Sequence, residues 1–216
     1  ITGSDLVEEA GVEVHKKLAL GEGVCRLSIC IPDDSPIQSP QDMAGCRIAT
    51  SFPHVTQKFF DRLKCPVTCV RLSGSVEVMV SLGVADAIVD LVETGSTLAA
   101  NRLRVLADIG QYETILIANQ RNGTSELAER ITRRLEGVVI ARGYSLVEFN
   151  IERSQVPAAH EIAPGFHSPT INPLEDPEWC AVRVMVKRSL VIDVMERLEA
   201  IGATAILETQ IANCRL

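Results

Sequence analysis

Residues 85–98 read ADAIVDLVETGSTL, an apolar run that passes directly into small hydroxylated residues. The run Ala85 to Val92 is typical of a buried strand that delivers Asp90 to its end, and the segment Leu98 to Asn101 predicts a helix. Between them lies the turn Thr94-Gly95-Ser96-Thr97. A strand that enters a helix through such a turn is typical of an α/β sheet, in which ligands bind at the carboxyl ends of the strands.

The turn at 94–97 has the composition of an anion-binding site. Successive backbone N–H groups at a helix start face an anion, and the helix dipole adds about half a positive charge. The hydroxyls of the turn add donors, and the Asp90 carboxylate before it suits ribose hydroxyls, which donate hydrogen bonds to carboxylates. We therefore expect a phosphorylated sugar as the ligand. A cluster of helix-capping residues without a ligand is the alternative.

An upstream segment repeats this strand–turn–helix pattern. Arg47 to Thr50 predicts a strand, which the turn Ser51-Phe52-Pro53 joins to a helix over Val55 to Leu63. His54 lies beside this turn, but no partner residue accompanies it in the sequence. A structural or solvated histidine is therefore favoured over a catalytic acid or base.

A second upstream segment has the same pattern. Val67 to Leu72 predicts a strand, which ends at Ser73-Gly74-Ser75 before a helix over Val76 to Leu82. Glu77 lies in the first turn of that helix, so a capping box with Ser73 or Ser75 as the cap is favoured over a ligand-binding turn. The alternation of strands, turns and helices predicts a mostly parallel sheet.

The segments around these units complete the first part of the chain. Residues 5–18 predict a helix, and residues 24–31 alternate with period two, as strands do. Residues 114–119 predict another strand. A helix follows from Thr124 and ends at Gly143, which marks the expected domain boundary.

The rest of the chain forms a self-contained pattern of strand, helix, strand, strand, helix and strand. The predicted elements are 144–150, 154–163, an extended edge segment at 168–174, 179–186, 190–201 and 205–211. The order βαββαβ is that of a ferredoxin-like module, which small-molecule sensing domains commonly use.

The composition is that of a folded globular protein. The 216 residues are 46% hydrophobic and 23% charged, and 21 basic against 28 acidic side chains give a net charge of −7. This balance excludes a disordered tail and argues against nucleic acid or an anionic membrane as a partner. No apolar stretch reaches the roughly 18 residues of a transmembrane helix.

Seven scattered cysteines without a C-x-x-C pair indicate reduced thiols, and hence the cytoplasm, rather than a disulfide framework. Cys65 and Cys69, four residues apart, are a weak metal signal. The sequence has no P-loop and no Gly-x-Gly-x-x-Gly fingerprint. Its first residues, Ile1 to Ser4, have the pattern of a strand end that enters a βα turn, so we expect upstream sequence to be missing.

Several of these segments together resemble the ATP phosphoribosyltransferase family, which catalyses the first step of histidine biosynthesis. The matching blocks are ITGSDL at 1–6, GCRIATSFP at 45–53, LSGSVE at 72–77, LGVADAIVDLVETGSTL at 82–98, SPTI at 168–171, IGA at 201–203 and NCR at 213–215. The last three blocks are similar to the long form of the family, which has a C-terminal regulatory domain. The ending Asn213-Cys214-Arg215 resembles fungal members.

The resemblance implies an α/β fold with a two-lobed catalytic region at 1–142, similar to periplasmic binding proteins. A ferredoxin-like, histidine-binding regulatory domain would follow at 143–216. The second lobe would span about 24–108, and the remainder of the catalytic region would belong to the first lobe. Family members begin with a strand and a basic loop that help to hold the substrates, and the resemblance implies that this sequence starts after them.

The implied reaction is displacement of pyrophosphate from phosphoribosyl pyrophosphate (PRPP) by N1 of the adenine of ATP, with Mg²⁺ as the cofactor. The implied catalytic residues are Asp90 and Glu93. Asp90 would bind the ribose hydroxyls, and the turn Glu93-Thr94-Gly95-Ser96-Thr97 would bind the 5-phosphate. The implied nucleotide contacts are Thr50, Ser51, Phe52, Ser73, Gly74, Ser75 and Glu77.

By the same resemblance, histidine is a feedback inhibitor that contacts Asn150, Thr170 and Ala203, and the chain forms a homo-oligomer, a hexamer or a dimer. Edge-strand and turn roles for these three residues are the alternative. A non-catalytic solute-binding or sensor protein also stays open, because a lobed fold with an open sheet suits simple ligand capture. Asp90 before the anion-binding turn distinguishes the two functions, since a plain amino-acid sensor does not need it.

Overall fold

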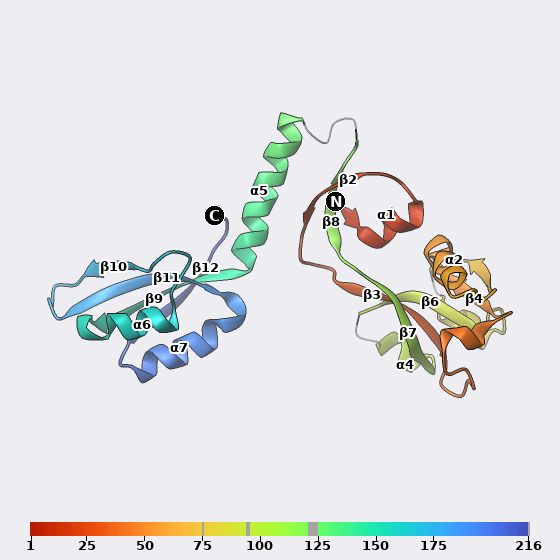
Figure 1. Cartoon of the computed structure of the whole chain (residues 1–216). Coiled ribbons are helices and arrows are strands. Elements are labelled where there is room, and N and C mark those ends of the chain that lie inside the picture. Colours follow the sequence, from red (N-terminus) through yellow and green to blue (C-terminus); the bar gives the residue numbers. More distant parts are fainter. Residues whose placement is uncertain (75, 94–95, 121–124, 216) are drawn as a thin grey trace. The chain divides into compact units, whose positions relative to one another are not determined.

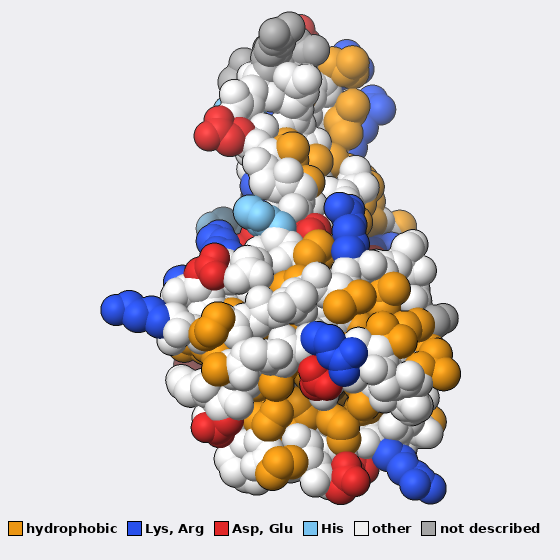
Figure 2. Space-filling model, turned by 90° about the vertical axis from the view of Figure 1, so that its right-hand side faces the viewer, with side chains coloured by type: hydrophobic (Ala, Val, Ile, Leu, Met, Phe, Trp, Pro, Cys, Tyr) orange, Lys and Arg blue, Asp and Glu red, His pale blue; other side chains and the backbone are white. Residues whose placement is uncertain are grey.

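The computed structural model describes residues 1–74, 76–93, 96–120 and 125–215 (Figure 1). They form two compact units, residues 1–128 and residues 129–216. Among the described residues, no helix is long and apolar enough to cross a membrane. On the face drawn in Figure 2, basic and acidic side chains are interspersed rather than gathered into a patch of one sign.

A small antiparallel sheet joins the two ends of the first unit. Its strands, in spatial order, are β1 (Thr2–Gly3), β8 (Thr114–Ala118) and β2 (His15–Ala19). The predicted strand at 114–119 is thus confirmed as the centre of this sheet.

Helix α1 (Ser4–Ala10) connects β1 to β2 and is shorter than the helix predicted over 5–18. It ends at Gly11, whose φ of 61° lies in the left-handed region that glycine adopts at helix C-termini. The prediction is wrong in its second half, because Gly11 stops the helix and the following residues pair with β8.

The larger sheet of the first unit is mixed. Its strands, in spatial order, are β5 (Thr68–Arg71), β4 (Arg47–Thr50), β6 (Ala87–Val92), β3 (Cys25–Pro32) and β7 (Leu103–Tyr112). β4 runs parallel to β5 and β6, whereas β3 runs antiparallel to β6 and β7. The mostly parallel sheet is therefore confirmed for β5, β4 and β6 and wrong for the other two strands.

Helices and apolar side chains cover both faces of this sheet. On one face, α2 (Pro53–Arg62) contributes Val55 and Phe60 to a core with Leu27 and Ile29 of β3. On the other face, the segments of α3 (Val78–Ser81) and α4 (Ser96–Ala100) pack over Cys30 and Ile88. Successive residues of a strand point to opposite faces, so the apolar β3 serves both cores. A short 3₁₀ helix, η1 (Pro40–Met43), lies between β3 and β4.

Helix α5 (Glu126–Arg142) begins in the first unit and ends in the second, because the division into compact units falls between Ala128 and Glu129. It ends before Gly143, as predicted. The proposed domain boundary at Arg142 stays a prediction.

The part of the second unit that follows α5, described to residue 215, is a four-stranded antiparallel sheet with two α-helices. Its elements, in chain order, are β9 (Tyr144–Glu152), η2 (Arg153–Gln155), α6 (Val156–Ile162), β10 (Thr170–Pro173), β11 (Trp179–Lys187), η3 (Arg188–Leu190), α7 (Val191–Ala200) and β12 (Thr204–Gln210). The spatial order is β10-β11-β9-β12, with every neighbouring pair antiparallel. This βαββαβ order, with the first and third strands central, confirms the predicted ferredoxin-like fold.

One face of this sheet is packed and the other is open. Val147, Phe149 and Ile151 of β9 are buried with Val182 of β11 and Leu198 of α7. The alternate residues of the same strands, among them Glu148 and Asn150, therefore lie on the open face. Of the candidate regulatory residues, Asn150 therefore lies on the open face.

Candidate functional site

Strand β6 brings Asp90 out of the core to a pocket. Ala87, Ile88 and Val89 are fully buried, whereas Asp90 is half-buried beside a cavity of about 350 Å³. We call this cavity the Asp90 pocket; its lining residues are Glu77, Ile88, Asp90, Leu91, Val92, Glu93, Thr97 and Leu98. An apolar strand that ends at a carboxylate-lined pocket has the geometry predicted for residues 85–98.

The Asp90 carboxylate is placed to accept further hydrogen bonds. Its Oδ1 accepts the backbone N–H of Leu91 at 2.8 Å. Burial raises the pKa of Asp90 above its ordinary value; the Leu91 hydrogen bond opposes this shift, and the negative charge of Glu77 adds to it. Burial disfavours the charged form of the carboxylate. A ligand hydroxyl or cation that binds the carboxylate would stabilise this charged form, which favours binding.

In the predicted segment 72–77, Glu77 is the residue that lines the Asp90 pocket. It lies at the start of α3 and is half-buried. Ser73 and Gly74 precede it on an exposed turn, in which Gly74 has a φ of 82°, while Ser75 lies outside the described residues. The carboxyl ends of β5 and β6 lie at one edge of the sheet because both strands run parallel to β4, and this brings the two motifs together.

The predicted anion-binding turn is described in part. Glu93 and Thr97 are exposed and line the Asp90 pocket, whereas Thr94 and Gly95 lie outside the described residues. Ser96 begins α4, a helix of five residues, and the backbone carbonyl of Thr97 accepts a hydrogen bond from Asn101. The described part therefore places a carboxylate and a hydroxyl-bearing residue beside Asp90.

The turn after β4 differs in character from the other two. Thr50 is fully buried, and its Oγ1 accepts the backbone N–H of Phe52 at 2.9 Å. Phe52 is 5% exposed and belongs to the core beneath α2, while Ser51 is half-buried. The buried side chains of Thr50 and Phe52 thus stabilise the turn, whereas Ser51 and the backbone are the parts that a ligand could contact.

Reasoning from the sequence did not single out β3, which pairs with β6, or β7, which pairs with β3, as parts of the site. Ser28 of β3 pairs with Asp90 on one side and with Asp108 of β7 on the other. The Ser28 hydroxyl donates to Asp108 Oδ1 at 2.6 Å. The available signal was Ser28, a polar residue within the apolar part of β3, on the same face of the strand as Cys30.

The three candidate regulatory residues lie on different elements of the second unit. Asn150 is half-buried on the open face and pairs with Ala181 of β11 and Thr204 of β12. Thr170 is exposed on the edge strand β10, opposite Arg183. Ala203 is 5% exposed and belongs to the core. The sheet brings Asn150 next to the segment of Ala203, whereas β11 separates Asn150 from Thr170.

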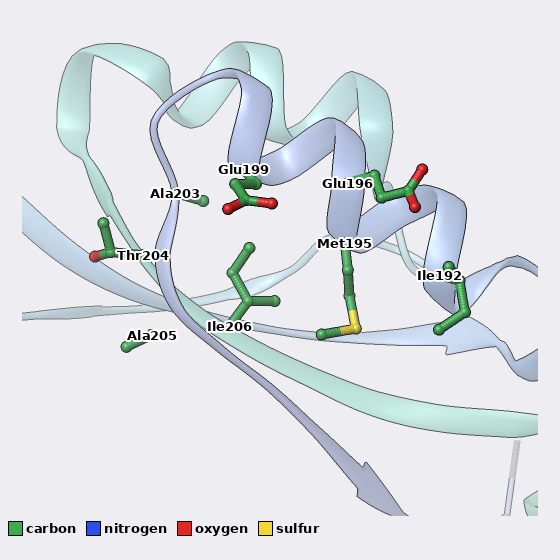
Figure 3. Close-up of a pocket in the computed structure, with 8 residues that line it drawn as sticks. All are labelled: Ile192, Met195, Glu196, Glu199, Ala203, Thr204, Ala205 and Ile206. Carbon is green, nitrogen blue, oxygen red and sulfur yellow. The ribbon is translucent and has the colours of Figure 1, made fainter.

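Ala203 also borders a cavity of about 530 Å³ between α7 and β12 (Figure 3). Met195 of the helix and Ile206 of the strand extend into the space between the two elements, with Glu196 and Glu199 on the helix beside them. The remaining lining residues are Ile192, Thr204 and Ala205.

The described residues include no group of three or more His, Cys, Asp or Glu side chains arranged to hold a metal ion. All seven cysteines are among the described residues, and each is a free thiol. The weak metal signal at Cys65 and Cys69 is therefore not supported: Cys65 lies against the carbonyls of Pro40 and Gln41, and Cys69 against Gln57.

Comparison with known proteins bears directly on these segments. Residues 1–137 match the family model described as ATP phosphoribosyltransferase, and residues 141–213 match the model of the HisG C-terminal domain. The chain belongs to the ATP phosphoribosyltransferase family. The C-terminal match identifies it as a member of the long form, as the sequence blocks at 168–171 and 201–203 predicted.

Individual relatives agree with this membership. An ATP phosphoribosyltransferase from Rhodopirellula baltica is 60% identical over 216 residues, which are 100% of this chain and 72% of that protein. An ATP phosphoribosyltransferase from Yarrowia lipolytica is 36% identical, and the alignment covers 100% of this chain and 75% of that protein. The fungal resemblance of the ending at 213–215 stays a prediction.

A solved structure supports the fold. The ATP phosphoribosyl transferase (HisG:HisZ) complex from Thermotoga maritima matches with a TM-score of 0.53 and 28% identity, over 60% of this chain and 63% of that one. The expected α/β fold of the catalytic region and the ferredoxin-like fold of the C-terminal domain are both confirmed.

Proposed function

We propose that this chain performs the reaction of its family, the transfer of the phosphoribosyl group of PRPP to N1 of the adenine of ATP. The bond from ribose C1 to the pyrophosphate oxygen breaks, its electron pair leaves with pyrophosphate, and N1 bonds to C1. The observation that supports this most is the Asp90 pocket, a cavity at the end of a buried strand whose lining includes Asp90, Glu77 and Glu93.

The pocket's own residues suit this chemistry without a covalent nucleophile. Asp90 accepts hydrogen bonds from the ribose hydroxyls and fixes the sugar, which supplies the positioning part of catalysis. Positive charge develops on the sugar as the leaving group departs, and the carboxylates of Asp90 and Glu93 stabilise that charge. The turn from Glu93 to Thr97 binds the 5-phosphate through backbone N–H groups and hydroxyls.

Mg²⁺ is the cofactor we propose, and the donors of the pocket fit it. Asp90, Glu77 and Glu93 offer carboxylate oxygens, the ligand type that Mg²⁺ prefers. Mg²⁺ is usually held by one or two carboxylates together with substrate phosphates, so a site with few protein ligands is the expected kind. When bound, the ion neutralises charge on the departing pyrophosphate.

For ATP we propose the sheet edge formed by the carboxyl ends of β4 and β5. Ser73 and Gly74 are exposed there, and Ser51 is half-buried. Thr50 and Phe52 contribute by holding the turn, and Glu77 lies between this edge and the Asp90 pocket.

We also infer that histidine binds the second unit as a feedback inhibitor, near Asn150, Thr170 and Ala203. A free amino acid needs a donor for its carboxylate and an acceptor for its ammonium group. Arg183 pairs in register with Thr170 on one side and with Glu148 on the other. Arg183 and Glu148 form an ion pair at 2.6 Å on the open face. Membership of the family supports two further proposals, a homo-oligomeric state (hexamer or dimer) and a cytoplasmic setting.

The proposed function is tested by calorimetric titration of PRPP with Mg²⁺ into Asp90→Asn and Asp86→Asn. Asp86 directly precedes β6, pairs with Arg47 at 2.9 Å and serves as the matched control. Loss of a hydrogen-bonded charge is expected to weaken binding by about 1–3 kcal/mol in Asp90→Asn, with no change in Asp86→Asn. Unchanged PRPP affinity in Asp90→Asn would remove Asp90 from the site.

A further inference from the structure

A row of polar residues crosses the sheet from the Asp90 pocket. Asp90 of β6, Ser28 of β3 and Asp108 of β7 are direct neighbours in the strand register. Ser28 is fully buried, so its hydroxyl, which donates to Asp108 at 2.6 Å, fixes the Asp108 carboxylate against the sheet. The other oxygen of that carboxylate is available to a second partner.

Arg26 is that second partner. Its Nη1 donates to Asp108 Oδ2 at 3.1 Å, and 49% of the Arg26 side chain is exposed. Arg26 lies two residues before Ser28 on β3, so the two side chains share one face of the sheet. Asp108 therefore holds the guanidinium over that face.

This face is the one that borders the Asp90 pocket. Arg26 pairs in register with Val92, which lines the pocket and directly precedes Glu93. The electrostatics of Cys30, buried on the same face, agree with this geometry. Burial raises the pKa of its thiol to about 12, the charges of Asp90 and Asp108 add to the shift, and that of Arg26 opposes it.

The chemistry of the pocket calls for a cation beside it, because its described lining residues include no arginine or lysine. Asp90, Glu77 and Glu93 all line it, and three carboxylates repel the phosphate groups of a phosphorylated sugar. A guanidinium has five N–H donors in a planar fork that matches phosphate oxygens. Asp108 takes one of these donors from Arg26, which leaves the others for a ligand.

We propose that Arg26 binds a phosphate group of the phosphorylated sugar in the Asp90 pocket, held in place for this by Asp108 and Ser28. The inference rests on the proposed function, which supplies the ligand. Arg26 directs the phosphate past the carboxylates, and its fixed position lowers the entropy lost on binding.

The matched control is the ion pair of Arg47 with Asp86. Its side chains are 47% and 43% exposed, against 49% and 41% for Arg26 and Asp108. Arg47 begins β4, at the opposite edge of the sheet from the carboxyl ends of the parallel strands. A general effect of losing an exposed arginine would therefore appear equally in Arg47→Gln.

The test is calorimetric titration of the wild-type chain, Arg26→Gln, Arg26→Lys and Arg47→Gln with PRPP, ribose 5-phosphate, inorganic pyrophosphate and free ribose. We expect Arg26→Gln to weaken PRPP binding about ten- to a hundredfold, as for the loss of a charge-assisted bidentate contact, and Arg26→Lys to weaken it less. Arg47→Gln is expected to bind as the wild type does, and free ribose to bind all four chains alike. If Arg26→Gln also weakens binding of ribose 5-phosphate, Arg26 contacts the 5-phosphate. If it weakens binding of pyrophosphate instead, Arg26 contacts the leaving group.

Each other outcome separates the two proposals. PRPP binding that is equal in the wild type and Arg26→Gln overturns the role of Arg26 and leaves the proposed function standing. Arg26-dependent binding of ribose 5-phosphate without binding of PRPP supports Arg26 and contradicts the proposed function. A folded wild-type chain that binds neither compound overturns both.

Discussion

The carboxylate of Glu9 accepts the backbone N–H of His54 at 3.1 Å, and its second oxygen accepts that of Val55 at 3.0 Å. A residue of α1 thus caps the N-terminus of α2, which has no side-chain cap of its own. The neighbouring Glu8 accepts from Lys58 Nζ at 3.1 Å and from the Tyr112 hydroxyl at 3.0 Å. Two successive carboxylates therefore join the small sheet's helix to the helix of the large sheet.

Glu9→Ala is expected to lower the free energy of unfolding of the first unit by about 1–2 kcal/mol, because two helix N–H groups lose their acceptor. Urea denaturation measures the change. Glu136→Ala, an exposed residue of α5, is the control and should stay within about 0.5 kcal/mol of the wild type. Equal stabilities of Glu9→Ala and the control would show that water replaces the cap at no cost.

Asp90→Asn is expected to make the folded chain more stable than the wild type at neutral pH. The pKa of Asp90 is raised by burial, so the folded state retains its proton at a pH where the unfolded chain, with a pKa of about 3.9, has lost it. The wild type therefore loses stability as pH rises from the unfolded pKa through the raised folded pKa, and Asn has no such loss. Thermal unfolding from pH 3 to 8 should show curves that meet at the acidic end and separate above it. A variant less stable than the wild type at pH 7 would contradict this account.

Leu198→Ala is expected to destabilise the second unit by about 2–5 kcal/mol, since Leu198 is fully buried between α7 and the sheet. Its exposed neighbour Glu199 supplies the control, Glu199→Ala, which should change stability little. Hydrogen exchange resolved by residue measures the two units separately. Protection of β9 and β11 should fall, while that of β3 and β6 stays. A parallel loss in both units would show that they unfold as one.

Thr170→Ala is expected to relieve inhibition by histidine while sparing turnover in an active enzyme, because Thr170 belongs to the proposed histidine site and is exposed on an edge strand of the second unit's sheet. Thr209→Ala is the matched control, an exposed threonine that pairs with Leu146 on the same sheet. Inhibition curves for histidine provide the measurement. Loss of turnover together with inhibition would point to a packing role for Thr170.

The elements that depend on local residue patterns could be predicted from the sequence. The run from Ala85 to Val92 became β6, and the ferredoxin-like order of the last part follows from period-two strands and the apolar stripe of α7. The predicted start of α3 at Val76 is two residues early, because Val76 and Glu77 form the turn before the helix.

What local patterns could not predict depends on pairing between distant segments. The sequence LRVLADIGQY of β7 mixes polar and apolar residues, and its pairing with β3 shifts register twice, so no alternation marks it as a strand. The antiparallel direction of β3 is likewise fixed by its neighbours and not by its own residues. For the same reason Ser28 and Arg26 entered the candidate site only when β3 was placed beside β6.

The most direct test of the account is calorimetric titration of the chain with PRPP and Mg²⁺, compared with ribose 5-phosphate and free ribose. We expect saturable binding of PRPP and weaker binding of ribose 5-phosphate. Both should be stronger than for ribose, because the pocket beside Asp90 recognises a phosphorylated sugar. Binding of PRPP no stronger than that of free ribose, in a chain shown to be folded, would contradict it.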